Sequence, residues 1–327
     1  MKRIVKKIAV SACAAVLAVA AFGIAGCSQD GAGSDSGSEP VIRIGTMQTE
    51  DSLPFWVAQE RNLYADQGIA AEIITFQSAQ ELSTAFAAGE IDAAMTDVQV
   101  SASLVASGTD LDLAWVTLGA DASQGRFGIM TSPDSGITEL SQLAGVPIGV
   151  GSNTVPEYVM DKLMLAAGVS EDDIVGEEIK KVPVRYQAMA EGQVAAAALP
   201  GSLLALGESQ GLVLLADDTQ GENISQSVFA VRASWLEENS ETLDAVRVVW
   251  DQAAQAINAD PEQFRSLLVE KANLPEPVAA SYPVAVYPEA SVPTDDMVAP
   301  VLEWMQEKGY LQAPLSYDQA TGMLTAA

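Results

Sequence analysis

Short apolar runs alternate with amphipathic runs in two stretches of this 327-residue chain, and this alternation limits the possible folds more than any other feature. In residues 41–95, three apolar runs are separated by two amphipathic runs, which end at Gly68 and Gly89. A strand–helix–strand order at this spacing predicts parallel strands joined by right-handed crossovers. The predicted strands are 41–45, 72–76 and 91–95, and the predicted helices are 54–67 and 79–88.

The same alternation returns further along the chain. Residues 85–95 align without gaps on residues 188–198, and both segments join a helix end, a glycine and a strand of small residues. Chance similarity between alanine-rich segments is the alternative, but the equivalent placement favours two similar lobes. The fold class is therefore α/β, with two mainly parallel sheets flanked by helices. The predicted strands here are 146–150, 178–182 and 194–199, the predicted helices are 155–167 and 185–190, and residues 234–309 are mainly helical.

Ligands of open parallel sheets bind where the strands end, beside the helices that follow. Four loops occupy such positions, at residues 46–54, 95–99, 151–156 and 199–202. Two lobes that face each other through these loops would enclose a small molecule. The residues that we predict to bind it lie within these loops or at the helix starts beside them; they are Thr46, Gln48, Glu50, Pro54, Trp56, Met95, Thr96, Asp97, Ser152, Asn153, Thr154, Leu199 and Pro200.

Two of these predictions have a purely structural alternative. Residues 152–154 (Ser, Asn and Thr) precede Pro156, and residues of these types cap helices as well as hold anions. The carboxylate of the adjacent Glu157 could also occupy the free amides of that helix start. Trp56 could line the cavity or belong to the core, whereas its neighbour Phe55 is expected in the core.

The composition disfavours several classes of function. The chain has 44 Asp and Glu against 16 Lys and Arg, and its formal charge of −28 would repel nucleic-acid phosphates. It has no His and only two Cys, so the commonest general acid–base residue and the ligands of a structural zinc site are missing. The Gly-x-Ser-x-Gly, P-loop and Gly-x-Gly-x-x-Gly sequences are absent. We therefore predict no catalytic residue, no metal site and no cofactor, although the many acids leave a glycosidase-like carboxylate pair as an alternative.

The N-terminus resembles the signal of a bacterial lipoprotein. Four basic residues precede an apolar run at 8–22, and the sequence Gly-Ile-Ala-Gly-Cys then ends at Cys27. In lipoproteins a peptidase cuts before this Cys, and the Cys thiol carries diacylglycerol. Residues 1–26 would then be a signal peptide, Cys27 the lipidation residue and residues 27–40 a flexible tether. A plain secretory signal with an incidental Cys is the alternative.

Five segments, taken in order, carry a resemblance to a known protein family. They are LPFWVAQERNLYADQGI, STAFAAGEIDAAMTD, LAGVPIGVGSNTVPEYVMDKLMLAAGV, AMAEGQVAAAALPGSLLAL and VFAVRASWLEENSETLDAV. The set resembles the substrate-binding proteins of bacterial ABC transporters, in the group that binds nitrate, taurine, alkanesulfonates or thiamine-precursor pyrimidines. The resemblance covers residues 41–258 well and the C-terminal helices loosely.

This resemblance implies a periplasmic-binding-protein type 2 fold. Lobe one would be 41–127 plus 229–327 and lobe two 128–228, with crossover segments near 125–131 and 225–231. It also implies a monomeric solute-binding component of an ABC importer, with a permease and its ATPase as partners. With the lipid on Cys27, the protein would be anchored to the outer face of the cytoplasmic membrane. A ligand-sensing protein of the same fold and an extracytoplasmic enzyme are the alternatives.

The resemblance and the residues disagree on the charge of the ligand. The family implies a small organic solute of the sulfonate, taurine, nitrate or aminopyrimidine kind, held by the four loops identified above. These loops and the adjoining helix start contain Glu50, Asp51, Asp97 and Glu157 but no Lys or Arg. A buried carboxylate beside a bound anion would be costly unless it were protonated. We therefore expect a neutral or amine-bearing ligand, with Asp97 contacting the amine.

Overall fold

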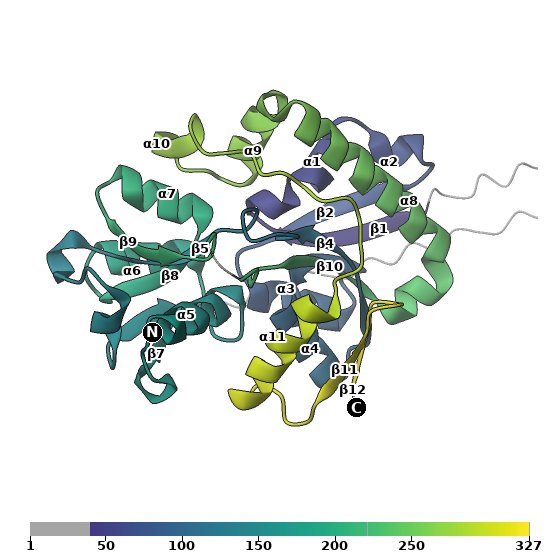
Figure 1. Cartoon of the computed structure of the whole chain (residues 1–327). Helices are drawn as coiled ribbons and strands as arrows, with labels where there is room; N and C mark the ends of the chain where they lie inside the picture. The colour runs from purple at the N-terminus through teal and green to yellow at the C-terminus, as the bar shows by residue number, and fades with distance from the viewer. Residues whose placement is uncertain (1–39, 221, 327) are drawn as a thin grey trace, which may run out of the picture. The chain divides into compact units, whose positions relative to one another are not determined.

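The computed structural model describes residues 40–220 and 222–326, whose strands form two separate sheets (Figure 1). The predicted signal peptide and Cys27, and the tether up to residue 39, lie outside the described residues. None of the described helices is long and apolar enough to cross a membrane.

The strands of the first sheet are β1 Val41–Met47, β2 Ala70–Phe76, β3 Ala93–Asp97, β4 Leu111–Leu118, β10 Ser227–Arg232, β11 Leu315–Asp318 and β12 Met323–Ala326. Their order across the sheet is β11-β12-β4-β10-β3-β1-β2. β1 pairs in parallel with β2 and β3, whereas β10 runs antiparallel to β3 and β4. The antiparallel pair β11 and β12 extends the sheet beyond β4.

The strands of the second sheet are β5 Phe127–Thr131, β6 Pro147–Val150, β7 Val175–Glu178, β8 Ala196–Pro200 and β9 Val213–Asp217, in the order β7-β6-β8-β5-β9. β6 pairs in parallel with β7 and β8, and β5 runs antiparallel to β8 and β9. Both sheets thus contain three adjacent parallel strands, β2-β1-β3 and β7-β6-β8, followed by an antiparallel strand and one more strand, and the first sheet is then extended by β12 and β11. β3 and β8 take the same position, and the glycines that precede them, Gly89 and Gly192, both have a positive φ (75° and 71°). The similarity of the two sequence segments therefore corresponds to a repeated structural unit.

The chain leaves the first sheet after Leu118 and returns to it at Ser227. Each connection ends where the next strand begins, at Phe127 for β5 and at Ser227 for β10. The predicted crossovers at 125–131 and 225–231 therefore fall largely on strands.

The α-helices among the described residues are α1 Leu53–Glu60, α2 Leu63–Asp66, α3 Ala79–Ala88, α4 Val98–Ala106, α5 Val155–Ala166, α6 Val182–Ala190, α7 Gly201–Ser209, α8 Ala233–Ala259, α9 Arg265–Lys271, α10 Glu276–Ala279 and α11 Asp295–Glu307. Short 3-10 helices occur at η1 Glu50–Ser52, η2 Pro133–Ser135, η3 Leu140–Leu143, η4 Glu171–Asp173 and η5 Pro261–Phe264. The predicted helix at 54–67 is two helices, because Asn62 between α1 and α2 adopts a left-handed conformation (φ 59°).

One difference from the predicted elements affects the functional site. The strand predicted at 178–182 ends at Glu178 as β7, and Val182 already begins α6. Pro183 favours this early start, because proline fits the first turn of a helix, where its missing N–H is not needed. The loop at 179–181 and the first turn of α6 therefore lie at the strand ends of the second sheet.

Stacked aromatic side chains hold α1 between the first sheet and α8. Trp115 of β4 stacks on Phe229 of β10 with 4.3 Å between ring centroids. Phe55 of α1 contacts Phe229 at 5.2 Å and Trp250 of α8 at 5.0 Å. Trp56 also belongs to this core and is only 4% exposed. Of its two predicted places, the cavity wall and the core, the structure therefore shows the core. This packing fixes the loop before α1 at the end of β1.

Candidate functional site

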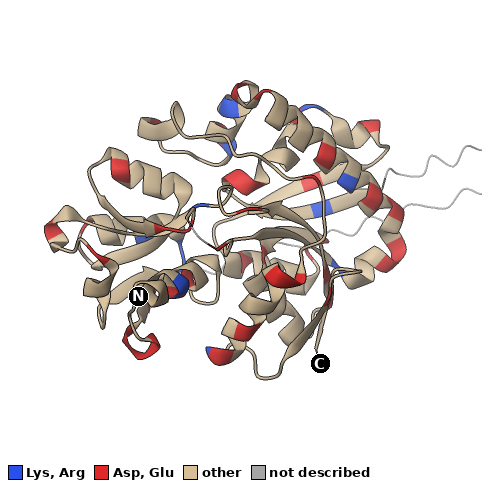
Figure 2. Cartoon of the chain, viewed as in Figure 1, with Lys and Arg blue, Asp and Glu red and all other residues tan. Residues whose placement is uncertain are grey.

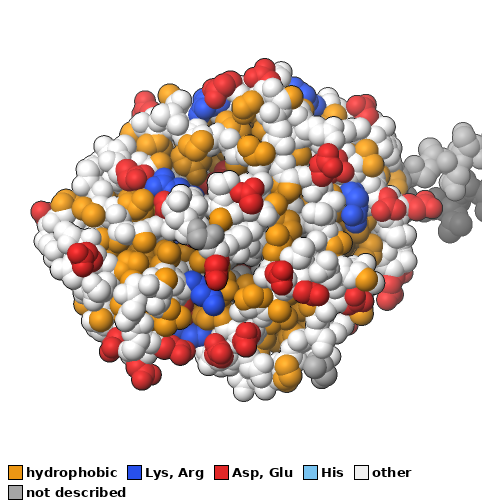
Figure 3. Space-filling model, viewed as in Figure 1, with side chains coloured by type: hydrophobic (Ala, Val, Ile, Leu, Met, Phe, Trp, Pro, Cys, Tyr) orange, Lys and Arg blue, Asp and Glu red, His pale blue; other side chains and the backbone are white. Residues whose placement is uncertain are grey.

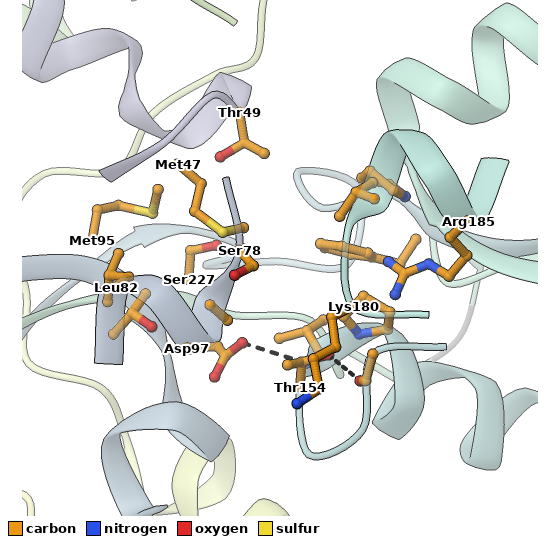
Figure 4. A pocket seen from close by; sticks show the side chains of 18 residues that line it. Met47, Thr49, Ser78, Leu82, Met95, Asp97, Thr154, Lys180, Arg185 and Ser227 are labelled. Atoms are coloured by element: carbon orange, nitrogen blue, oxygen red, sulfur yellow. Dashed lines mark hydrogen bonds between the residues drawn. The ribbon is translucent and has the colours of Figure 1, made fainter. Parts of the chain in front are cut away.

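A cavity of about 90 Å³ lies where the strand ends of the first sheet face those of the second (Figure 4). Both sheets supply its walls, as expected for a ligand site at the carboxyl ends of parallel strands. The lining residues are Met47, Thr49, Ser78, Ala79, Leu82, Met95, Thr96, Asp97, Phe127, Gly151, Thr154, Val155, Pro156, Lys180, Val182, Arg185, Pro200 and Ser227.

The wall from the first sheet is mainly apolar. Its larger apolar side chains are Met47, Leu82 and Met95, which Figure 4 shows together on this side of the cavity. Ser227 adds a hydroxyl to this wall, and it donates a hydrogen bond of 2.6 Å to Asp51 Oδ2. Burial raises the pKa of Asp51, which lies behind this wall and is not part of the lining.

Asp97 is the one carboxylate of the lining, and protein donors occupy both of its oxygens. Oδ1 accepts from Val100 N at 2.7 Å and caps α4, while Oδ2 accepts from Val155 N at the start of α5 at 3.4 Å. Burial raises the pKa of Asp97 to about 6, against the effect of these two backbone donors. Asp97 therefore links a helix start beside the first sheet to one beside the second.

Replacing Asp97 by asparagine is expected to raise the free energy of unfolding by about 1–3 kcal/mol at pH 8 and by almost nothing near pH 4. The asparagine oxygen keeps the cap of α4 at Val100 N, and its Nδ2 cannot accept from Val155 N, so only the longer bond of 3.4 Å is lost. Because the folded-state pKa is raised, the native state binds a proton before the unfolded chain does, so the wild type gains stability as pH falls from about 6 towards 3.8. Urea unfolding at pH 4, 6 and 8 measures the effect. An equal pH dependence in wild type and variant would contradict it, and Asp66→Asn, at an exposed position, is the control.

Arg185, in the first turn of α6, brings a buried cation to the opposite wall. Its side chain is 1% exposed, Nη1 donates to Ile179 O at 3.3 Å, and Nε has no partner. Burial lowers the pKa of Arg185 to about 10, so the guanidinium is still charged at neutral pH. No ion pair within the described residues involves it. The charge of Glu178 opposes this lowering of the pKa, so the wall from the second sheet holds a buried positive charge that a carboxylate compensates only in part.

Two glycines at the end of β6 make room for this guanidinium. A Cβ atom at Gly151 would lie 3.0 Å from Arg185 Nη1, and one at Gly149 would lie 3.3 Å from Arg185 Cγ. Any larger residue would crowd the arginine. The run Gly149-Val150-Gly151, which in sequence looks like part of a nucleotide motif, therefore accommodates Arg185.

Hydrogen bonds between the two sheets close one edge of the cavity. Lys180 Nζ donates to Gln80 Oε1, and Asn153 Nδ2 donates to Ser103 Oγ at 2.6 Å. Lys180 also lines the cavity, so a second cation stands near Arg185. Lys180 is more exposed, with 53% of its side chain accessible.

The amides at the start of α5 are occupied by protein carboxylates. Asn153 N donates to Glu157 Oε2 at 2.5 Å, and Ser152 N donates to Glu178 Oε2 at 2.8 Å. With Val155 N bonded to Asp97, the helix start presents few free donors. Residues 152–154 thus fit the alternative of a capped helix start better than that of an anion-binding site.

The structure brings together some of the predicted site residues and separates the others. Met95, Thr96, Asp97, Thr154 and Pro200 line the cavity. Gln48, Ser152 and Asn153 line neighbouring hollows, and Glu50 faces a different one, where it accepts from Tyr282. The remaining predicted residues are buried away from the cavity; they are Thr46, Pro54, Trp56 and Leu199.

The expectation of a purely acidic site was wrong. Lys180 and Arg185 both line the cavity, and they follow a fifth strand end, that of β7, which the sequence interpretation placed four residues too late. Pro183 was the available signal for the correct helix start. Among the described residues, no three His, Cys, Asp or Glu side chains are grouped so that they could hold a metal ion.

A sequence model of the proteins described as NMT1/THI5 like matches residues 49–264, two thirds of the chain. The chain belongs to the NMT1/THI5-like family. The matched region contains every residue that lines the cavity except Met47. A comparison with curated protein sequences gave no significant match.

Solved structures resemble this family member in fold. The periplasmic aliphatic sulphonate binding protein SsuA of Escherichia coli superimposes with a TM-score of 0.70 at 20% identity, over 85% of this chain and 90% of that one. The alkanesulfonate-binding protein SsuA of Xanthomonas axonopodis pv. citri, bound to MOPS, gives 0.68 at 22% identity, over 84% and 93%. The nitrate-binding protein NrtA of Synechocystis PCC 6803 gives 0.60 at 12% identity, over 88% and 75%. This chain thus has the two-lobed fold of the periplasmic binding proteins.

Proposed function

We propose that this protein is the extracytoplasmic solute-binding component of an ABC importer and that its ligand is a small organic anion. The family supports a role in solute binding. The observation that supports an anionic ligand most strongly is the guanidinium of Arg185, which is buried in the wall of a cavity between the two sheets and has no partner at Nε. This replaces the neutral or amine-bearing ligand that the sequence alone favoured.

Electrostatics favour an anion at Arg185 despite the negative charge of the whole protein. Figure 2 shows Asp and Glu at many positions along the ribbon, and Figure 3 shows acidic side chains spread over the visible face with fewer Lys and Arg. A buried charge without a partner is costly, and a bound anion would compensate it. Lys180 adds a second positive charge, which Glu178 offsets in part at 4.0 Å from its Nζ, whereas Asp97 is already bonded to two amides. The cavity is therefore more favourable to anions than the surface around it.

The fold neighbours support an oxyanion in particular. Two of them are sulfonate-binding proteins and one is a nitrate-binding protein. A planar guanidinium can donate two parallel hydrogen bonds to such a group. The cavity, at about 90 Å³, is far smaller than the 300–1,000 Å³ that a drug-sized ligand occupies, so it suits a small charged head.

Binding would stabilise the closed arrangement of the two sheets. The ligand would contact Arg185 on one wall and the apolar side chains around Met95 on the other. It would therefore add to the few hydrogen bonds that already join the two sides, such as Asn153 to Ser103. A ligand shifts a conformational equilibrium only through such differential contacts. No chemical step is part of this proposal.

We also propose that the protein is exported and held at the outer face of the cytoplasmic membrane by a lipid on Cys27. The basic, apolar and small-residue segments before Cys27 support this. Residues 27–40 would serve as the tether between the lipid and the folded part. We further propose that the protein is a monomer with two lobes. Lobe one comprises 41–127 plus 229–327, and lobe two comprises 128–228.

Mass spectrometry of the ligand that remains bound through native purification tests the function directly. We expect an organic anion that carries a sulfonate or another oxyanion and that leaves on partial unfolding. Recovery of an amine or a neutral heterocycle that rebinds tightly would overturn the anion and restore the earlier expectation. Calorimetry with methanesulfonate and with methylammonium gives an independent measurement.

A further inference from the structure

The helices α5 and α11 form a direct contact between the two sides of the molecule (Figure 1). α5 packs against β5 and β8 of the second sheet, whereas α11 packs against α4 and β11 of the first sheet. Three neighbouring residues on one face of α5, namely Glu157, Tyr158 and Asp161, are nevertheless almost fully buried, with 2–5% exposed. The first turn of the same helix lines the ligand cavity with Val155 and Pro156.

One lysine faces both carboxylates of this contact. Lys308 Nζ lies 3.0 Å from Asp161 Oδ2 and 3.9 Å from Glu157 Oε1. Trp304 Nε1 donates to Asp161 Oδ2 at 2.8 Å, and the hydroxyl of Tyr310 donates to Glu157 Oε2 at 2.8 Å. Both acids belong to α5, and the other three residues belong to α11 or to the segment directly after it. We call these five residues the α5–α11 cluster.

An aromatic contact accompanies the polar ones. The ring of Tyr158 meets the ring of Trp304 edge-on, with 5.2 Å between the centroids. Tyr158 belongs to the same buried apolar cluster as Val298 and Met305 of α11. A residue of the second side is therefore part of a core that mainly serves the first side.

The cluster is connected to the cavity wall but is not part of it. Glu157 Oε2 accepts from Asn153 N, and the next residue, Thr154, lines the cavity. None of the five cluster residues is itself among the lining residues. The cluster can therefore fix the position of this wall whether or not a ligand is bound.

The charges of the cluster make its stability depend on Lys308. Two carboxylates share one ammonium group, and no other Lys or Arg of the described residues forms an ion pair with either acid. Asp161 Oδ1 is buried without a hydrogen-bond partner, and burial raises the pKa of Glu157. Separation of the two helices would return both carboxylates to water, which offsets much of the contact energy. The contact is therefore able to open, and it opens more easily without the lysine.

We propose that Lys308 is a positioning residue for the ligand cavity, because through the α5–α11 cluster it holds the two sides together and so strengthens ligand binding without touching the ligand. The effect on binding rests on the proposed function. The effect on the arrangement of the two sides does not, because it needs no ligand.

Lys308→Met in the mature protein tests both effects. It leaves Asp161 buried without a cation, so we expect X-ray scattering of the unliganded variant to give a larger radius of gyration than the wild type. Calorimetry should show about tenfold weaker binding of methanesulfonate. This is the low end of the range for a hydrogen bond to a charged group, because 23% of the Lys308 side chain is exposed.

Two further variants separate the charge from a general loss of structure. The double variant Lys308→Met, Asp161→Asn buries no unpaired charge and keeps an acceptor for Trp304 Nε1, so it should recover most of the affinity and the smaller radius. Trp304→Phe keeps an aromatic ring but loses the donor to Asp161, so it should weaken binding a few-fold. Lys271→Met is the matched control, because Lys271 pairs with Glu270 at 3.0 Å at an exposed position on the first side.

The outcomes distinguish this proposal from the proposed function. An unchanged radius of gyration in Lys308→Met, or an unchanged affinity for methanesulfonate, overturns the positioning role. A double variant that binds as weakly as Lys308→Met overturns it as well, because the loss would then not come from the charge. If methanesulfonate does not bind to the wild type, the proposed anion site fails, and the two radii alone decide whether Lys308 holds the sides together.

Discussion

Arg185→Gln is expected to weaken binding of the oxyanion ligand about 30- to 4,000-fold. Removing one partner of a buried, hydrogen-bonded charge pair costs about 2–5 kcal/mol, which corresponds to this range. Glutamine is neutral and too short to replace the hydrogen bond from Arg185 Nη1 to Ile179 O at 3.3 Å. The variant therefore removes the charge together with this one bond. Calorimetry of wild type and variant with methanesulfonate measures it.

The stability of the unliganded protein distinguishes this role from a structural one. Because Arg185 is buried and makes no ion pair in the described residues, its replacement should leave the unfolding free energy unchanged or raise it. The thermal stabilisation that ligand gives to the wild type should disappear. Lys180→Gln should weaken binding only a few-fold, because Lys180 is half exposed, and Arg61→Gln, at an exposed position, should have no effect. A strongly destabilised variant that still binds ligand normally would contradict the assignment.

The sequence predicted the strand-end loops because the pattern that encodes them is local. Apolar runs, helix-closing glycines and capping residues mark where each strand stops, and the rule for parallel sheets then places a ligand there. Met95, Thr96, Asp97 and Thr154 were found in this way. The alignment of 85–95 on 188–198 likewise predicted the repeated arrangement of the two sheets.

The cations were missed because one strand end was misplaced. The apolar residues after Glu178 continued the strand pattern, so Lys180 was assigned to a strand and Arg185 to the start of a later helix. In the structure, Arg185 reaches the cavity from the first turn of α6, beneath Gly149 and Gly151. Arg185 can lie beside the cavity only because Gly149 and Gly151, at the end of β6, leave space for its side chain. The sequence around Arg185 itself does not contain this information.

The two acids in the loop before α1 show a second limit of sequence reasoning. Glu50 accepts from Tyr282 at 2.7 Å, and its backbone carbonyl accepts from Tyr287 at 2.6 Å. Asp51 accepts from Ser227. These donors lie more than 170 positions away in the sequence, so only the folded chain shows that neither acid lines the cavity. The burial of Trp56 also depends on the folded chain. Phe55 and Trp56 are both buried because α1 lies between the first sheet and α8.

Cys27→Ser is expected to move nearly all of the protein from the membrane fraction to the soluble fraction. Removal of residues 1–26 would leave 12 basic and 44 acidic residues, a formal charge of −32. Such a chain is repelled by anionic lipid, and none of the described helices could span the bilayer. Only the acyl chains, each contributing about 0.8 kcal/mol per buried methylene, would hold it at the membrane, and stable anchoring needs more than one chain.

Metabolic labelling with a fatty acid and fractionation of the cells measure both parts of this expectation. The wild type should be labelled and sediment with membranes, and Cys27→Ser should show neither property. Cys13→Ser is the matched control, because Cys13 lies in the segment that would be removed and should affect neither labelling nor location. If the wild type itself carries no label and stays in the membrane fraction with residues 1–26 attached, the apolar run at 8–22 is the anchor and the lipoprotein signal is wrong. If Cys27→Ser is released but the wild type carries no label, the N-terminus is a plain secretory signal and another contact holds the wild type at the membrane.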